Sequence, residues 1–130
     1  MSDPEFLDLS DVLQIHDLQI AEYGGGQGIR DQGALESAVS QPAARFGGDF
    51  LHRDLQEMPA AYAFHIAQNQ PFIDGNKRTG LAAALVFLEL NGFGMDDPDG
   101  RLETAMLDLA VRRMDKIGLA GLLRELSRPR

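Results

Sequence analysis

The sequence predicts an all-α protein, a compact single domain over residues 1–130 with about six helices and at most one small hairpin or flap. Three observations predict this class. Segments with apolar residues at helical spacing dominate the chain, and no two strong strands occur among them. Apolar residues make up 44% of the 130, enough for one core, and the chain has no cysteine to support that core with disulfides.

The elements of the first half follow from local signals. A helix is expected over residues 10–23 with Ser10 as its cap, and the glycine-rich residues 24–28 then break the chain. A short helix is expected over residues 31–42, where a proline ends it. Residues 43–53 combine two glycines with alternating apolar and polar side chains, which predicts a loop or a short hairpin.

The second half of the chain contains the expected core helices. Residues 54–69 predict a helix that a proline either kinks or divides, and a turn over 70–75 leads into a long helix over 76–91. That long helix is apolar on nearly every side, so we expect it to be central and buried. Two more helices fit residues 101–114 and 119–127.

The distribution of charge along the chain limits the classes of partner that the protein can bind. Residues 1–110 hold six Lys or Arg and 18 Asp or Glu, whereas residues 111–130 hold six Lys or Arg and two Asp or Glu. The net charge of the whole chain is −8. An acidic body repels a phosphate backbone, which argues against nucleic-acid binding as the main role. The basic tail is either a solvated helix face or a docking site for an acidic protein segment.

The chain also shows no sign of export. Its first nine residues contain no Lys or Arg, unlike the start of a signal peptide. The longest apolar stretch, Leu81–Leu88, is too short to span a membrane. We therefore expect a cytoplasmic protein without a membrane partner.

The stretch Gln70–Gly80 is the most informative about chemistry. A glycine-containing turn runs directly into a helix N-terminus, whose free N–H groups and partial positive charge attract anions. Asn76 adds an amide there, and Lys77 and Arg78 add two cations suited to phosphate. Asp74 adds one carboxylate, and Mg²⁺ typically takes one or two carboxylates plus phosphate oxygens. The pattern indicates a site for a nucleotide triphosphate with a metal.

A purely structural interpretation of the same stretch stays open at this point. Asp and Asn are ordinary caps at a helix start, and cations there do not help the helix. Phe72 is most simply a core anchor beneath the turn.

The stretch resembles the Fic-domain motif: His, any residue, Phe, any residue, Asp or Glu, a small residue, Asn, Gly or Lys, and Arg. Six positions fit, namely Phe72, Asp74, Gly75, Asn76, Lys77 and Arg78. Lys77, and Leu81 where typical Fic enzymes have a second arginine, point to the Doc branch, the death-on-curing toxins of toxin–antitoxin systems. The segments 9–23, 24–31 and 33–38 are similar to the N-terminal part of that branch, so the resemblance covers almost the whole chain.

The resemblance implies a compact helical fold that binds ATP and Mg²⁺. Typical Fic enzymes transfer AMP to a protein hydroxyl, whereas Doc phosphorylates a threonine of elongation factor Tu and is blocked by a partner antitoxin. By position, Asp74 would hold the metal, and Gly75, Asn76, Lys77 and Arg78 would bind phosphates. Phe46, Gly47, Gly48, Asp49, Phe50, Leu51 and His52 would form a flap that aligns the target. Gly75 agrees with AMP-transferring members, so kinase and adenylyltransferase both stay open.

Position 70 departs from the motif, because Gln70 stands where the family has its general-base histidine. A glutamine amide cannot accept a proton at physiological pH, and losing a general base costs roughly 10²–10⁴ in rate. We expect a chain that binds nucleotide but transfers poorly. Gln70 is either an introduced substitution that disarms a toxin, or natural, leaving a pseudo-enzyme or one with another base. We interpret His65 as a packed helix histidine and His16 as a surface or core residue, and keep His52 as the alternative base.

Overall fold

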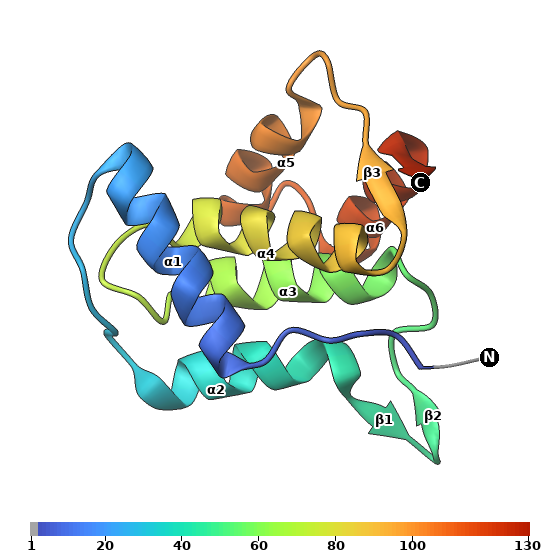
Figure 1. Ribbon diagram of the computed structural model, residues 1–130, viewed down its shortest axis with the longest axis horizontal. Coiled ribbons are helices and arrows are strands. Elements are labelled where there is room, and N and C mark those ends of the chain that lie inside the picture. The colour runs from blue at the N-terminus through green and yellow to red at the C-terminus, as the bar shows by residue number, and fades with distance from the viewer. Residues whose placement is uncertain (1–2) are drawn as a thin grey trace.

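The computed structural model describes residues 3–130, and its architecture is all-helical as predicted (Figure 1). The described residues form six α-helices, one 3₁₀ helix and two small pairs of strands. In chain order the elements are α1 (Leu9–Tyr23), α2 (Gln32–Ser40), the 3₁₀ helix η1 (Gln41–Ala43), β1 (Arg45–Phe46), β2 (Asp49–Phe50), α3 (Glu57–Asn69), α4 (Asn76–Leu90), β3 (Phe93–Met95), α5 (Arg101–Ala110), α6 (Lys116–Leu126) and β4 (Ser127–Pro129).

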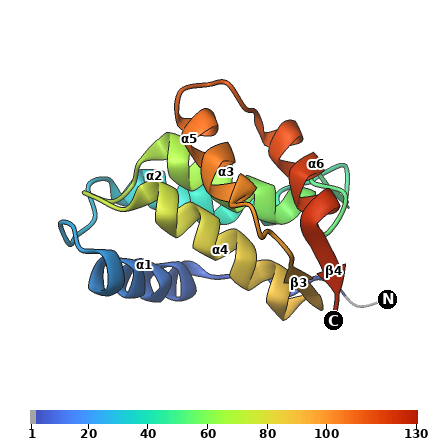
Figure 2. The same cartoon turned by 90° about the horizontal axis from the view of Figure 1, so that it is seen from above.

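The antiparallel pair α3 and α4 forms the centre of the molecule. Seen from above, α1 lies on one side of this pair, and α5 and α6 lie on the other (Figure 2). The two helices approach closely because Gly80 has no side chain: a Cβ there would lie 2.9 Å from the carbonyl oxygen of Ala63. This contact sets the spacing of the two helices that carry the motif.

Hydrophobic residues pack on both sides of the central pair. One core cluster lies toward α5 and α6 and includes Leu88, Leu102, Leu109, Leu119 and Leu123. The other lies toward α1 and α2 and includes Val12, Leu35, Tyr62, Ile66, Phe72 and Phe87. The long helix is therefore central, as its apolar sequence predicted.

Several helix boundaries differ from the sequence prediction by a few residues. Helix α1 is capped by Asp8 rather than Ser10, because the Asp8 carboxylate accepts the Asp11 N–H in a reciprocal capping box. Helix α3 begins at Glu57 rather than at residue 54, since the Asp54 carboxylate caps the turn before it. Its proline lies in the first turn, where no intrahelical N–H bond is lost.

The C-terminal boundaries also shift. Helix α5 ends at Ala110 rather than at residue 114, and Arg112 follows in a left-handed conformation at φ 63°. Helix α6 begins earlier than predicted, at Lys116, because the Asp115 side chain caps it by accepting the Gly118 N–H.

The two strand pairs have different origins. Strands β1 and β2 form the small hairpin that the sequence predicted, with Arg45 opposite Phe50. Strands β3 and β4 join residues 93–95 to residues 127–129, and this pairing was not predicted because its partners are far apart in sequence. No helix within residues 3–130 is long and apolar enough to cross a membrane.

Candidate active site

The motif turn, residues 70–75, connects the C-terminus of α3 to the N-terminus of α4. Gln70 caps α3 in a left-handed conformation, with φ 47° and ψ 56°. The Arg30 guanidinium donates to two main-chain oxygens at this helix end, from Nε to Gln70 at 2.7 Å and from Nη2 to Asn69 at 2.8 Å. A cation is well placed there, because the last carbonyls of a helix lack partners and carry partial negative charge. Arg30 thereby fixes the main chain of position 70.

The glycine-rich segment before α2 lies along the motif turn and pairs with it. Ile29 forms an isolated antiparallel bridge with Phe72, and the Ile73 N–H donates to the Gly28 carbonyl at 3.1 Å. The Pro71 carbonyl accepts from the N–H groups of Arg30 and Asp31, at 2.7 and 3.0 Å. The sequence predicted this segment only as a break between helices, but it forms one wall of the site.

The Asn76 side chain closes the motif turn from within. Its Oδ1 accepts the Phe72 N–H at 2.9 Å, and its Nδ2 donates to the Phe72 carbonyl at 3.0 Å. Both ends of the amide are thus engaged by one residue of the turn. The contact that the structure gives this side chain is structural, and a phosphate contact from it stays a prediction.

The Asp74 carboxylate is exposed and held in a fixed direction. Its Oδ2 accepts the Gly26 N–H at 3.2 Å, and its Oδ1 accepts the Gly75 N–H at 2.9 Å. These two hydrogen bonds, with a smaller contribution from Arg78, lower the pKa of Asp74. Gly25 lies beside this carboxylate at φ 118°, a backbone conformation that favours glycine. The carboxylate is therefore charged and aimed at the mouth of the turn.

The N-terminus of α4 lies beside this carboxylate. Its cap residue, Gly75, has φ 77° and no side chain to bond the first-turn N–H groups, which leaves them available to an anion. Lys77 and Arg78 are exposed at the same helix start, and the Arg78 guanidinium lies 5.0 Å from the Tyr23 ring centre. The structure thus brings Asp74, Gly75, Lys77 and Arg78 together on one surface.

Sequence reasoning missed His16 as part of this site. Its ring is 3% exposed and stacks on Phe72 at 3.8 Å between centroids, with 5° between the planes. Its Nε2 lies 2.9 Å from the Asp74 carbonyl oxygen. One signal could have shown its burial: His16 shares the i, i+4 spacing of Val12 and Ile20, the buried face of α1.

The site has one carboxylate with which to hold a metal. Within residues 3–130 there is no cluster of three or more His, Asp or Glu side chains arranged around a common point. Mg²⁺ does not need such a cluster, because it keeps several waters and takes one or two carboxylates plus substrate phosphates. The Asp74 carboxylate, next to the α4 N-terminus, fits that donor set.

The predicted flap lies away from the motif turn. Phe50 packs on Phe6 and lines a cavity with Asn91 and Phe93, at the opposite end of α4 from the motif turn (Figure 1). The segment 46–49 is exposed there, and Phe46 is 82% exposed. The structure therefore does not bring the hairpin and Gln70 together, and its flap role stays a prediction.

The other two histidines also lie away from position 70. His52 is 4% exposed and lines a cavity with Glu57 and Lys116, near the start of α3. This position does not support His52 as a substitute base. His65 is packed within α3 beside Lys116, in line with its predicted role as a packed helix histidine.

This geometry, with a motif turn between two central helices and a carboxylate beside an uncapped helix start, defines the class of protein. The chain belongs to the Fic/DOC family, whose family model matches residues 6–88. It is 36% identical to Toxin Doc from Mycolicibacterium smegmatis over 118 residues, which cover 89% of this chain and 88% of that protein. It is 37% identical to Protein kinase doc from Escherichia phage P1 over 87 residues, covering 67% and 68%. The family resemblance identified from the motif is confirmed.

Proposed function

We propose that this chain is a Doc-type toxin whose motif turn binds ATP with Mg²⁺. With a base at position 70, it would transfer phosphate to a serine or threonine hydroxyl of a translation protein such as elongation factor Tu. The observation that carries this proposal is the Asp74 carboxylate, fixed by two main-chain bonds beside the open N-terminus of α4. The relative named Protein kinase doc supports phosphate transfer over other chemistry.

The residues of the site divide the work of such a transfer. The first-turn N–H groups of α4, with Lys77 and Arg78, would hold phosphate oxygens, and Asp74 would hold Mg²⁺. A bound Mg²⁺ would neutralise charge on those oxygens. The hydroxyl oxygen would bond to the γ-phosphorus as the bond to the bridging oxygen of ADP breaks, and the hydroxyl proton would pass to a base at position 70.

Gln70 limits this reaction in the present chain. The residue is exposed, and its side chain makes no hydrogen bond within residues 3–130 that would give it another role. The amide cannot take the hydroxyl proton at neutral pH. We therefore infer that the chain binds nucleotide and transfers phosphate poorly.

The decisive experiment is a transfer assay with γ-labelled ATP on the Gln70→His variant. We expect its transfer rate to exceed that of the Gln70 chain by roughly 10²–10⁴, the usual contribution of a general base. In the same background, Asp74→Ala should remove the Mg²⁺ dependence. Expressed without an antitoxin, Gln70→His should also arrest growth. No growth arrest and no labelled protein in a lysate would contradict the proposal.

A second candidate, AMP transfer, is favoured by Gly75, which agrees with the AMP-transferring branch. The mass added to the target decides between them, because phosphate adds about 80 Da and AMP about 329 Da to the accepting hydroxyl.

A third, non-catalytic candidate follows from Gln70: the chain would bind nucleotide or an antitoxin without transfer. This candidate fails if Gln70→His shows transfer and the natural coding sequence has histidine at position 70.

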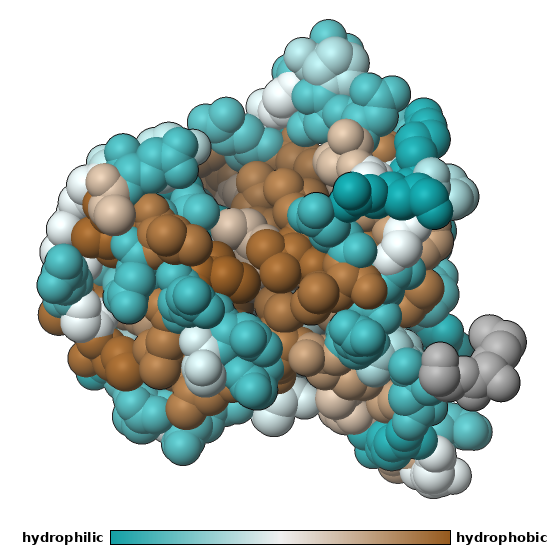
Figure 3. Space-filling model, viewed as in Figure 1, coloured by the Kyte–Doolittle hydropathy of each residue, from teal (hydrophilic) through white to brown (hydrophobic). Residues whose placement is uncertain are grey.

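Partners of the chain follow from its surface. On the face shown in Figure 3, hydrophobic residues gather over α4 between α1 and α5. We propose that an antitoxin protein covers part of this surface, as the relative named Toxin Doc suggests.

A target that touches both the motif turn and the hairpin would have to span the length of α3, about 20 Å for 13 residues. A folded protein can do so, whereas a short peptide side chain cannot.

A further inference from the structure

We propose that His16 is a positioning residue, which sets the direction of the Asp74 carboxylate and so the strength of Mg²⁺-dependent nucleotide binding. This inference rests on the proposed function, because it concerns the same nucleotide site. His16 belongs to α1, far from the motif in sequence, and its ring is almost fully buried against the turn.

The hydrogen bond from His16 acts on one particular peptide unit. The Asp74 carbonyl oxygen can only accept, so the His16 Nε2 at 2.9 Å must carry the proton that it donates. The same peptide unit contains the Gly75 N–H, which donates to the Asp74 carboxylate at 2.9 Å. Because a peptide is planar, fixing the direction of its C=O also fixes the direction of its N–H. His16 therefore orients the group that orients the carboxylate.

The stacking contact supplies the second constraint. The His16 ring lies parallel to Phe72, two residues before Asp74, and Phe72 is itself 1% exposed. Stack and hydrogen bond together hold the turn at two points from one side chain. A Cβ on Gly75 would lie 3.8 Å from Nε2, so the ring also packs against the cap of α4.

Two substitutions separate the hydrogen bond from the packing. His16→Phe keeps a flat ring against Phe72 but has no donor. His16→Gln places an amide N–H near the position of Nε2 but gives up the ring. If His16 only fills the core, His16→Phe should stay closer to the unchanged chain than His16→Gln does, both in Mg²⁺-dependent ATP binding and in melting temperature. If His16 positions Asp74, the Gln variant should keep the metal dependence that the Phe variant loses.

The experiment is calorimetric titration of the Gln70 chain with ATP, with and without Mg²⁺, together with thermal melting. We expect His16→Phe to weaken ATP binding in Mg²⁺ by about tenfold, the usual effect of losing a group that orients a metal ligand. Its binding without Mg²⁺ should stay within about twofold, as should both measurements for His16→Gln. His16→Gln should therefore rank above His16→Phe in the Mg²⁺ dependence of binding and below it in melting temperature.

The outcomes distinguish the two proposals. If the unchanged chain binds no ATP with Mg²⁺, the proposed function fails and this inference fails with it. If the unchanged chain binds but His16→Phe keeps the full Mg²⁺ effect, only the role of His16 is overturned. The tautomer of His16 can also be measured in the unchanged chain, so this test applies even if His16→Phe does not fold. Imidazole ¹⁵N shifts should show the proton on Nε2, and a proton on Nδ1 alone would overturn the inference.

Discussion

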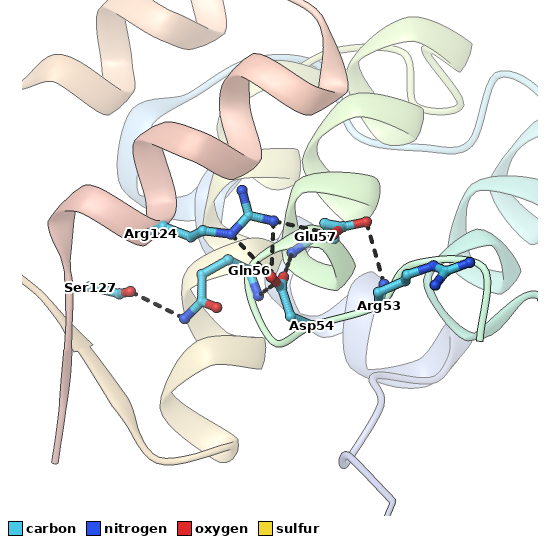
Figure 4. A network of polar contacts seen from close by, with 6 residues as sticks. All are labelled: Arg53, Asp54, Gln56, Glu57, Arg124 and Ser127. Carbon is cyan, nitrogen blue, oxygen red and sulfur yellow. Dashed lines mark hydrogen bonds and ion pairs between the residues drawn. The ribbon is translucent and has the colours of Figure 1, made fainter. Parts of the chain in front are cut away.

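The two ends of helix α3 are held by different kinds of interaction. At its C-terminus, the motif turn is fixed mostly by hydrogen bonds to main-chain groups, from Arg30, Asn76 and His16. At its N-terminus, ion pairs dominate: Arg124 of α6 contacts Asp54 at 2.9 Å and Glu57 at 3.2 Å (Figure 4). In the same network, Gln56 donates to Ser127, so the C-terminal segment is tied to the start of α3.

The side of α3 that faces the start of α6, together with the loop before α3, also contains titratable groups under partial burial. The Lys116 Nζ lies 3.1 Å from the His65 Nε2, and burial together with this cation lowers the pKa of His65 to about 4. The pKa of His52 is lowered too, first by burial and then by Lys116. A cavity of about 240 Å³ lies beside these groups, lined by His52, Glu57, Lys116, Ile117, Ala120 and Arg124.

The difference teaches how one helix can serve two purposes. Hydrogen bonds to main-chain oxygens and N–H groups depend less on salt than exposed ion pairs do, so we expect the motif end to keep its shape as the ionic strength rises. Ion pairs weaken as salt is added, and the lowered pKa of His65 makes the side of α3 that faces α6 sensitive to pH. The chain therefore holds its proposed reactive geometry with contacts that depend less on salt than the ion pairs at the other end of α3 do.

The largest expected effect tests the motif end. Asn76→Ala leaves the N–H and the carbonyl of Phe72 without partners, and we expect a loss of about 2–3 kcal/mol in the free energy of unfolding. Urea denaturation measures this loss. Lys77→Ala, one residue later and exposed, is the matched control and should stay within about 0.5 kcal/mol. Equal effects from both variants would show that the turn is not held as described.

The next effect tests the side of α3 that faces α6, through pH. The unfolded chain protonates His65 near its ordinary pKa of 6.5, whereas the folded chain resists protonation down to about 4. Stability should therefore be full above pH 6.5 and fall as pH drops toward 4. We expect a loss of about 2 kcal/mol from this residue, discounted because the ring is partly exposed. Denaturation at pH 7 and pH 4.5 should show a smaller difference for His65→Gln, and an unchanged difference would rule His65 out as the cause.

The smallest effect compares the two arginines directly. Arg124→Met removes exposed ion pairs and should cost about 1 kcal/mol at low salt, with the cost shrinking in 1 M NaCl. Arg30→Met removes bonds to carbonyl oxygens, so a similar cost should persist in salt. Melting both variants at two salt concentrations measures this. If salt reduces the stability loss of Arg30→Met as much as that of Arg124→Met, the proposed difference between the two ends of α3 is wrong.

Much of the fold was predictable because its signals are local. Helical spacing, glycine breaks and the motif located the six helices and the turn between α3 and α4. The cap at Asp8 rather than Ser10 was missed because both residues can cap, and only the observed hydrogen bond decides between them. The pairing of β3 with β4 was missed because its short segments meet only after α5 and α6 are placed.

The candidate site was predictable in part for the same reason. Asp74, Gly75, Lys77 and Arg78 are consecutive or nearly so, and a helix start brings them together without help from the rest of the chain. His16 and Arg30 act on the turn from distant segments, and nothing in the local sequence indicates the partner of a histidine or an arginine. The hairpin was assigned by resemblance, which does not give its distance from the turn.

The contact between Gly80 and Ala63 has a consequence for how such a protein could diversify. Because no side chain lies between Gly80 of α4 and the main chain of Ala63, the spacing of α3 and α4 at that point cannot be adjusted by a small change of side chain. The two helices that flank the motif turn are therefore held close together at this contact. New chemistry would then arise more readily by exchanging side chains on the turn than by moving the helices that flank it.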